Sequence, residues 1–483
     1  MIADVRDFIG QFLAESFWAE IFSIAGFLLA FFLIARLMSE KKAPANTFAW
    51  LLVIVLIPYF GVPLYLLFGG RKLRSLAALK RRLRPTLPAY AIGPPSAYAT
   101  TPVAQTLISA GGGSPVPGNS LRLIVTGEED FHELERRIRN ARHSIHITAF
   151  ILGRDETGRR IVTLLAQRAR DGIKVRLLLD ALGCLVSSRG FVQPIRDAGG
   201  EVARFMPVLP FTSRRSANLR NHRKIAVFDH TVALVGGRNL AHEYMGPTPF
   251  NKRWRDFGAV IEGPAAALLN EVFIADWCFA TRQPADALHA EIPPHVGQSC
   301  GTSDLQVVAS GPDVPGEPLY EGIISMIQEA KYRICIITPY FIPDDVLLRS
   351  LIVKARAGCA ITLVLPAKSN HPITDFARRH YVREMQRAGA RVLLIAPPML
   401  HAKAMIVDQT VGLLGSANFD LRSLFVNFEI GVLVHSPADV AAMAAWAEAI
   451  VSECQEFRLD PGRRHKLFGN IAEDLSRLLA PLL

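Results

Sequence analysis

The distribution of hydrophobic positions predicts two membrane-spanning helices near the start of the chain. Residues 48–68 read FAWLLVIVLIPYFGVPLYLLF, without a charged side chain, which matches the roughly 20 apolar residues that a helix needs to cross a bilayer. A second apolar stretch, IFSIAGFLLAFFLIA at residues 21–35, becomes long enough if Glu20 and Arg36 extend their charges to the membrane surfaces. We therefore expect a transmembrane helical hairpin with spans at about 17–38 and 48–68.

Beyond residue 120, the pattern changes to alternating strands and helices. Runs of Ile, Val and Leu that are typical of buried strands alternate with helical stretches ending at Gly172 and Gly358. The order of segments occurs twice: SIHITAFILGRDETG, RARDGIKVRLLL and NHRKIAVFDHTVALVGGRN are followed by RICIITPYFIPDDVL, KARAGCAITLVL and LHAKAMIVDQTVGLLGSAN. This repeat predicts two α/β domains related by a pseudo-twofold axis, at residues 121–300 and 301–483. A site would form where they meet.

A basic segment and a linker connect the two parts. Seven Lys and Arg side chains lie within residues 71–84 with no acid among them, and residues 85–121 carry no charge and are rich in Pro, Gly, Ser and Ala. Basic segments beside membrane spans stay in the cytoplasm and attract anionic lipid headgroups. We therefore expect a membrane anchor at residues 1–70, a basic juxtamembrane segment and linker at residues 71–120, and the remainder facing the cytoplasm.

Composition narrows the class of protein. Of the 483 residues, 50% are hydrophobic and 20% are charged, with a formal net charge of +11, which excludes a disordered chain. The six cysteines include no C-x-x-C pair, which argues against a thiolate zinc site and against a disulfide scaffold. We expect reduced, mostly buried thiols.

Each half carries one copy of a motif built around a histidine and a lysine. The first copy, H-x-K-x4-D-x6-G-G-x-N, comprises His222, Lys224, Asp229, Gly236, Gly237 and Asn239. The second, H-x-K-x4-D-x6-G-S-x-N, comprises His401, Lys403, Asp408, Gly415, Ser416 and Asn418. Because side chains two apart on a strand share a face, each histidine should project from a strand together with its lysine. A single H-x-K is usually a surface or core feature, but two matched copies indicate a common site.

A pair of such motifs suits chemistry on phosphodiesters. The charge of a diester repels nucleophiles, so cations and hydrogen-bond donors must bind its oxygens. One imidazole can attack phosphorus while the other protonates the leaving alkoxide and then accepts the proton of the incoming alcohol. Asp229 and Asp408 complete the motifs at turns after the strands, and we interpret them as structural or charge-balancing groups, not as bases. The side chains expected to hold the phosphate are Lys224, Lys403, Asn239, Ser416 and Asn418.

The two motifs resemble the HKD signature of the phospholipase D superfamily, over nearly the whole chain. More narrowly, AWLLVIVLIPYFGVPLYLLFGG beside the basic segment, WRDFGAVIEGP, TPYFIPDD and SANFDLRSLFVNFEIGVLV are similar to membrane-anchored bacterial cardiolipin synthases. The resemblance implies a phosphohistidine mechanism without metal or nucleotide cofactor, with His222 as the nucleophile and His401 as the acid. It also implies that an acidic residue orients each histidine: Asp256, 34 residues after His222, and Glu429, 28 residues after His401.

The function that this resemblance implies is phosphatidyl transfer. The enzyme would join two phosphatidylglycerol molecules into cardiolipin and release glycerol at a bacterial inner membrane, with phosphatidylglycerol and anionic membrane lipid as its partners. Two membrane spans argue against a nuclease, and so against nucleic acid as a partner. A phospholipase D hydrolase or a phosphatidylserine synthase-like transferase would use the same site with another acceptor. A non-catalytic, anionic-lipid-binding membrane scaffold is the alternative outside enzymes, and the complete His-Lys pairs argue against it.

Three features depart from the superfamily pattern or remain open. Gly237 stands where serine is usual, which leaves at most a backbone N–H as a donor. Asn370 stands where an acid is common, so His371 is as readily structural as functional. Four arginines crowd the first motif, and they either bind lipid headgroups or form a solvated basic loop: Arg214, Arg215, Arg220 and Arg223.

Overall fold

The computed structural model describes residues 96–457, except 186, 188–189, 207–218 and 294–295, together with part of residues 24–65. The basic segment, residues 85–95 of the expected linker, and Arg214 and Arg215 lie outside the described residues. The rest of the expected linker is structured and not a flexible connection: it forms two helices, at Ala97–Thr100 and Pro102–Ser109, and the start of the strand Val116–Ile124. The chain divides into two units, Met1–Arg71 and Lys72–Leu483.

The first unit contains the predicted membrane anchor. Its described part includes helical residues between 24 and 35 and the helix α2 (Pro44–Leu56). A small apolar cluster is buried there, formed by Leu33, Ile54, Val62 and Tyr65. Among the residues that the structure describes, no helix combines the length and the apolar character needed to span a bilayer. The expected hairpin falls partly outside the described residues and stays a prediction.

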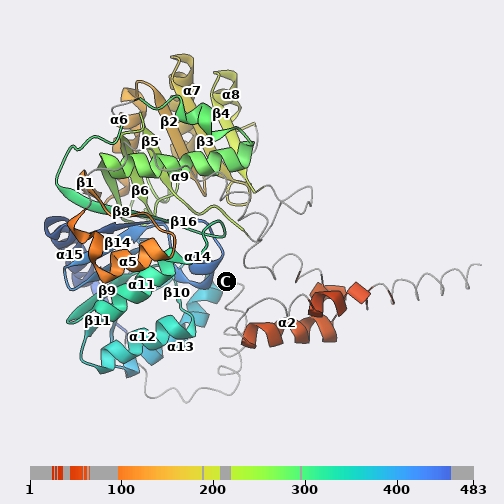
Figure 1. Ribbon diagram of the computed structural model, residues 1–483, viewed down its shortest axis with the longest axis vertical. Coiled ribbons are helices and arrows are strands. Elements are labelled where there is room, and N and C mark those ends of the chain that lie inside the picture. Colours follow the sequence, from red (N-terminus) through yellow and green to blue (C-terminus); the bar gives the residue numbers. More distant parts are fainter. Residues whose placement is uncertain are drawn as a thin grey trace, which may run out of the picture. The chain divides into compact units, whose positions relative to one another are not determined.

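One mixed sheet of 15 strands organises the second unit (Figure 1). From the centre outward, its first half contains β1 (Val116–Ile124), β7 (Gly258–Glu262), β6 (Val232–Gly236), β5 (Ile225–Phe228), β2 (Ser144–Ala149), β3 (Lys174–Asp180) and β4 (Glu201–Phe205). Its second half contains β8 (Ser303–Ser310), β16 (Glu429–Val434), β14 (Val411–Gly415), β13 (Ala404–Val407), β9 (Arg333–Ile337), β11 (Ala360–Pro366), β12 (Arg391–Ile395) and β17 (Cys454–Glu456). The halves repeat one strand order apart from β17, which confirms the α/β class.

The hydrogen-bond register makes the two halves equivalent position by position. Ile225, three residues after the first motif histidine, pairs with Thr148, and Ala404, three residues after the second, pairs with Ile337. Thr148 and Ile337 are therefore equivalent. The halves join through antiparallel pairing of β1 with β8. Both halves belong to one continuous sheet and form one compact unit, which has no internal division at residue 300. The limits of the two domains that the sequence suggests therefore stay a prediction.

Helices cover the sheet so completely that every residue of β2 and β13 is buried. Figure 1 shows α9 (Pro264–Thr281) lying across the strands of the first half. The first half also contains α6 (Gly127–Asn140), α7 (Glu156–Arg170), α8 (Gln193–Asp197) and α10 (Ala285–His289). The second contains α11 (Pro318–Glu329), α12 (Asp345–Arg356), α13 (Pro372–Arg387), α14 (Leu421–Phe425) and α15 (Pro437–Ser452). The short helices η2 (Ala97–Thr100) and α5 (Pro102–Ser109) precede β1.

The equivalent helices α7 and α12 begin and end in the same way. Asp155 accepts a hydrogen bond from the backbone N–H of Gly158 at the start of α7, and Asp344 accepts one from Leu347 in α12, as N-cap residues do. Each helix is followed by a glycine with positive φ, +85° at Gly172 and +92° at Gly358, a conformation that glycine adopts without steric cost. The helix ends expected from the sequence are confirmed.

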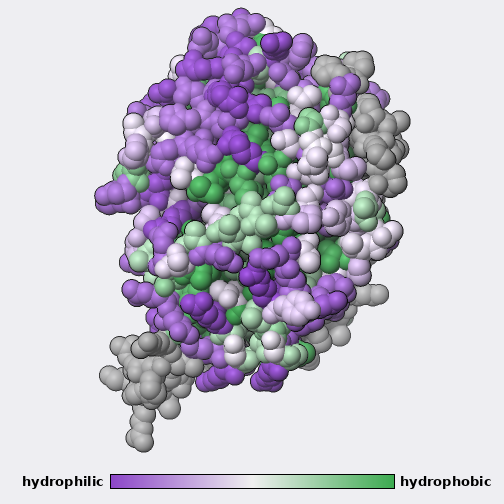
Figure 2. Space-filling model, turned by 90° about the vertical axis from the view of Figure 1, so that its left-hand side faces the viewer, coloured by the Kyte–Doolittle hydropathy of each residue, from purple (hydrophilic) through white to green (hydrophobic). Residues whose placement is uncertain are grey.

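The surface of the second unit is not uniformly polar. Figure 2 shows hydrophobic side chains gathered across the middle of one face, with hydrophilic side chains predominating above them. All six cysteines are free, and among them Cys300 alone is exposed, in line with the expected reduced thiols.

Candidate active site

The two H-x-K segments lie in the part of the chain that leads into a strand, not on the strand itself. Strands β5 and β13 begin at Ile225 and Ala404, one residue after each lysine, which corrects the expectation that histidine and lysine project from a strand. The backbone of each histidine is held by the other half of the molecule. His222 N–H donates to Phe428 O at 2.9 Å, and His401 N–H donates to Arg255 O at 2.7 Å.

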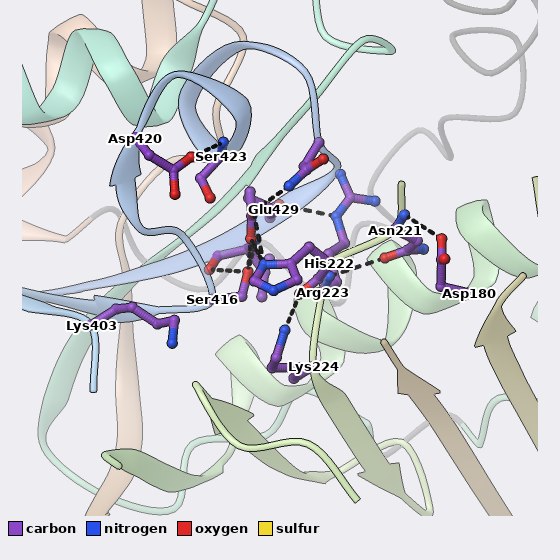
Figure 3. A network of polar contacts seen from close by, with 12 residues as sticks. Asp180, Asn221, His222, Arg223, Lys224, Lys403, Ser416, Asp420, Ser423 and Glu429 are labelled. Carbon is purple, nitrogen blue, oxygen red and sulfur yellow. Dashed lines mark hydrogen bonds and ion pairs between the residues drawn. The ribbon is translucent and has the colours of Figure 1, made fainter. Parts of the chain in front are cut away.

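The orienting carboxylates are exchanged between the halves. His222 Nδ1 lies 2.9 Å from Glu429 Oε1 and 3.0 Å from Oε2 (Figure 3), and His401 Nδ1 lies 2.6 Å from Asp256 Oδ2. The sequence spacing suggested that each carboxylate serves the histidine of its own half, and that pairing is wrong.

The backbone explains the exchange. Isolated bridges join Asn221 to Phe428 and Arg255 to Leu400. The residue before each histidine is therefore paired with the residue before the carboxylate of the opposite half. Because the carboxylates hold Nδ1, Nε2 is the nitrogen of each imidazole that remains for chemistry.

Both lysines lie beside their own histidines. Lys224 Nζ donates to His222 O at 2.8 Å, while Lys403 Nζ lies 2.8 Å from His401 Nδ1 and 3.1 Å from Nε2. Aromatic rings support the imidazoles: the ring centroid of Phe150 is 4.9 Å from that of His222, and those of Tyr244 and Trp254 are 5.0 Å and 5.4 Å from that of His401. Sequence reasoning missed these aromatic supports, although Trp254 stands two residues before Asp256.

Burial controls the protonation of the histidines and lysines. Burial lowers the pKa of His222, against the opposing charge of Glu429. Burial and the charge of Lys403 lower the pKa of His401 to about 3. Burial also lowers the pKa of Lys224 to about 7 and that of Lys403 to about 8. Without substrate, both imidazoles are therefore neutral at neutral pH, and a bound anion would favour the charged lysines.

The two carboxylates stay ionised in this buried site. Burial alone would raise the pKa of Asp256, but its interaction with His401, to which it is hydrogen-bonded, and the charge of Lys403 outweigh burial, so that this pKa lies below its usual value. The pKa of Glu429 is likewise lowered, because His222 outweighs the effect of burial. Each carboxylate can therefore stabilise the imidazolium that forms when its histidine takes up a proton.

The motif aspartates lie at the ends of strands and hold turns. Asp229 accepts hydrogen bonds from the backbone N–H groups of Arg142, His143 and Ser144. Asp408 accepts the matching bonds from Lys331, Tyr332 and Arg333. Both have a φ of +49°. This placement fits the structural interpretation of the two aspartates.

Ser416 and Gly237 differ in how they meet the orienting carboxylates. Ser416 Oγ donates to Glu429 and accepts from the backbone N–H of Ile430 at 3.0 Å, so its hydroxyl hydrogen is already used. A Cβ at Gly237 would collide with Asp256 Oδ1, and the Gly237 N–H donates to Phe257 O at 3.1 Å. The glycine thus makes room for the carboxylate instead of supplying a phosphate donor.

The asparagines of the two motifs have different partners. Asn239 Oδ1 accepts a hydrogen bond from the backbone N–H of Ile151 at 3.2 Å. Asn418 is buried and its Oδ1 has no hydrogen-bond partner. The phosphate-binding role expected for Asn239, Asn418 and Ser416 stays a prediction.

Two of the four arginines near the first motif are structural. Arg223 is buried, with its guanidinium 2.6 Å from Asp276 Oδ1 and its Nε donating to Glu429 O at 3.0 Å. Arg220 is buried beside Asp180, 3.5 Å from Oδ1. Neither forms a lipid-binding surface or a solvated loop, because both are buried beside acidic partners. The sequence contains no signal for these partners.

The arrangement of two histidines, each held by a carboxylate of the other half, defines the class of protein as a phospholipase D-like enzyme. Residues 134–277 and 323–451 match the family model of the cardiolipin synthase, phospholipase D-like domain, and residues 27–70 match that of the phospholipase D-nuclease N-terminal segment. The chain belongs to the cardiolipin synthases, a family of phosphatidyltransferases within the phospholipase D superfamily.

Curated relatives match the chain over almost its whole length. Cardiolipin synthase 1 of Bacillus cereus is 30% identical, with 98% of this chain and 96% of the relative covered. A cardiolipin synthase of a Geobacillus species is 33% identical, with 92% and 90% covered. The major cardiolipin synthase of Bacillus subtilis is 30% identical, with 97% and 99% covered.

A solved structure supports the fold. The phosphatidylserine synthase of Haemophilus influenzae superposes with a TM-score of 0.58 at 17% identity, covering 79% of this chain and 98% of that one. At this identity the likeness concerns the fold and not the acceptor.

Proposed function

We propose that this protein transfers a phosphatidyl group from one phosphatidylglycerol to a hydroxyl of another, giving cardiolipin and glycerol. Family membership supports the class of reaction. The observation that carries the mechanism is the exchange of carboxylates, which leaves Nε2 of both buried histidines unengaged by Asp256 and Glu429, beside two lysines. Such a site offers a nucleophile and an acid to one anionic phosphodiester.

The reaction balances with these groups alone. The bound anionic diester favours the protonated form of His401. His222 Nε2 attacks phosphorus, forming a P–N bond as the P–O bond to the leaving glycerol breaks, and the protonated His401 supplies the proton that this alkoxide takes up. A hydroxyl of the second phosphatidylglycerol then gives its proton to His401 and forms the new P–O bond as the P–N bond breaks. Lys224 and Lys403 hold the non-bridging oxygens, with Asn239 and Asn418 as further donors.

The products of one incubation test this function. Purified full-length protein in micelles that contain phosphatidylglycerol as the only phospholipid should yield cardiolipin and glycerol in equal amounts, without added nucleotide. Phosphatidic acid as the only product would assign a hydrolase. Activity only with CDP-diacylglycerol would assign a transferase of the phosphatidylserine synthase type.

The membrane arrangement is part of the proposal. The two apolar stretches, the match of residues 27–70 to an N-terminal family segment, and the basic residues 71–84 support a two-span anchor with the catalytic unit in the cytoplasm. A cysteine introduced at residues 39–47 should then be labelled from outside the cell. A reporter that is active only in the cytoplasm should be active when it is fused after Leu483. The reverse pattern would overturn the orientation.

A further inference from the structure

The internal twofold allows the two sides of the site to be compared position by position. Because Thr148 and Ile337 are equivalent, Ile151 in the first half corresponds to Tyr340 in the second. The pairing of Leu152 with Leu240 and of Phe341 with Phe419 repeats this equivalence one residue further on. The two sides can therefore differ in chemistry while sharing a backbone plan.

The equivalent positions around the site differ consistently in polarity. Asp420, two residues after Asn418, corresponds to Ala241, two residues after Asn239. Leu178 pairs with Thr148, and Val364 pairs with Ile337, so six residues later Cys184 corresponds to Asn370. Three apolar residues of the first half, Ile151, Cys184 and Ala241, are thus matched in the second half by Tyr340, Asn370 and Asp420.

The polar residues of the second half lie close together, and we call Tyr340, Asn370 and Asp420 the polar wall. Tyr340 Oη donates to Asn370 Oδ1 at 2.5 Å. Asp420 lies beside this pair, because β15 (Phe419–Asp420) runs parallel to β10 (Phe341–Ile342), with Asp420 opposite Ile342. Burial raises the pKa of Tyr340, and the charge of Asp420 raises it further, as expected for neighbours. The wall extends from the buried Asp420 to the exposed Asn370.

Asp420 also faces the catalytic groups. Figure 3 shows Asp420 beside Ser423, on the same side of Glu429 as Lys403, and Asp420 interacts electrostatically with Glu429 and Lys403. Its Oδ1 accepts a hydrogen bond from the backbone N–H of Ser423 at 2.7 Å and thereby caps α14. A carboxyl group near Lys403 and His222 is a group that binds hydroxyl donors and not phosphate oxygens.

In the first half, the turn after β3 takes the place of the turn after β11 that carries Asn370, and we call Ile151 and the two leucines of this turn the apolar wall. Leu182 and Leu185, in the turn after β3, are 44% and 63% exposed. Between them, Gly183 lies against Phe150, whose ring packs on His222. This wall therefore leads from exposed leucines to the ring that supports one catalytic histidine.

We propose that the two walls bind the two chemically different ends of the phosphodiester, which rests on the function proposed above. The wall of Tyr340, Asn370 and Asp420 holds the hydroxyls of the glycerol headgroup, both that of the leaving glycerol and that of the acceptor. The wall of Ile151, Leu182 and Leu185 contacts the apolar diacylglycerol part. Tyr340 and Asp420 therefore determine acceptor specificity, while the histidines carry out the chemistry.

A competition between two three-carbon alcohols tests the polar wall. The donor is the p-nitrophenyl ester of phosphatidic acid, and the acceptors are glycerol and 1-propanol, which differ by two hydroxyls. Losing a hydrogen bond to a hydroxyl lowers the ratio of phosphatidylglycerol to phosphatidylpropanol by about 3- to 10-fold. We expect this loss in Tyr340→Phe and in Asp420→Asn, which keeps a capping side chain for α14. Tyr332→Phe, which alters an exposed tyrosine before β9, is the matched control and should keep the wild-type ratio.

The apolar wall is tested by chain length. Leu185→Ser should raise KM for a dioleoyl donor about 3-fold or more relative to a dihexanoyl donor, with the glycerol-to-propanol ratio unchanged. Release of p-nitrophenol shows in every variant that the protein is folded and active.

The outcomes separate the inference from the proposed function. If the ratio is unchanged in both Tyr340→Phe and Asp420→Asn, the polar wall is refuted, even where the wild type makes cardiolipin. If the wild type makes no cardiolipin from phosphatidylglycerol but the ratio falls in these variants, the proposed function fails and the wall stands. A ratio that falls equally in Tyr332→Phe would also overturn the inference.

Discussion

His222 in the first half of the molecule is hydrogen-bonded through Nδ1 to Glu429 in the second half, at 2.9 Å from Oε1. The equivalent contact of the second motif joins His401 Nδ1 to Asp256 Oδ2, in the first half, at 2.6 Å. Neither half therefore contains a complete histidine–carboxylate pair. The catalytic unit exists only when the sheet is continuous across β1 and β8, and each orienting carboxylate acts on the half-reaction of the opposite motif.

Because Glu429 holds His222 and Asp256 holds His401, the two carboxylate variants should affect different steps. If each carboxylate held the histidine of its own half, the expected effects of the two variants would be interchanged. Glu429→Gln should slow formation of the covalent intermediate about 10- to 100-fold, because it disturbs the orientation of His222. Asp256→Asn should slow the same step with phosphatidylglycerol, but much less with a p-nitrophenyl leaving group, which needs little protonation by His401. Rapid-quench measurement of both variants on both donors provides the comparison. A rescue of Glu429→Gln, but not of Asp256→Asn, by the good leaving group would contradict the exchanged assignment.

Gly237 and Ser416 occupy equivalent positions, but they should not tolerate the same changes. Gly237→Ser should nearly abolish activity, because its Cβ would meet Asp256 Oδ1 and displace the carboxylate from His401. Ser416→Ala should lower kcat about 10-fold or more, through loss of one hydrogen bond to the ionised Glu429. Steady-state kinetics beside a thermal unfolding curve separates these effects from misfolding. Wild-type activity in Gly237→Ser would refute the steric argument.

The sequence repeat was enough to predict the symmetric α/β core, because strands such as β3 and β11 are rich in Val, Leu and Ile and α7 and α12 end at glycines. It also brought His222, His401 and both lysines together. The carboxylate pairing could not be read from the spacing, since the bridge between Asn221 and Phe428 connects segments about 200 residues apart in the chain. Nor could the burial of Arg223, because its partner Asp276 carries no motif.

The lowered pKa values of the two lysines predict that activity declines at an unusually low pH on the basic side of the pH–rate profile. Lys224 and Lys403 have pKa values of about 7 and about 8, so their charges are present below these values and are lost as pH rises through them. Because kcat/KM reports the free enzyme, it should decline above about pH 7 to 8. The limb of kcat should lie at higher pH, since a bound anionic diester raises the lysine pKa values. A kcat/KM that stays flat to about pH 9 would be inconsistent with these buried lysines.

The buried pair of Arg223 and Asp276 should dominate local stability. Arg223→Met leaves Asp276 buried without this cation, and breaking such a pair costs about 3–5 kcal/mol. The matched control is Arg387→Met, which removes a solvent-exposed pair with Glu384 and should change the free energy of unfolding by less than about 1 kcal/mol. Urea unfolding of both variants measures the difference. Equal stability of the two variants would show that Arg223 is not a core element.

The last prediction separates the two histidines. With His222 as the nucleophile, His222→Ala should form no covalent intermediate with any donor. His401→Ala should still accumulate phosphohistidine from the p-nitrophenyl donor, because a good leaving group departs without the acid, whereas turnover with phosphatidylglycerol should be lost. Quenching each variant and mapping the acid-labile phosphate by peptide mass identifies the residue that carries it. Phosphate on His401 in His222→Ala, together with none on His222 in His401→Ala, would reverse the two roles while leaving the exchanged carboxylates in place.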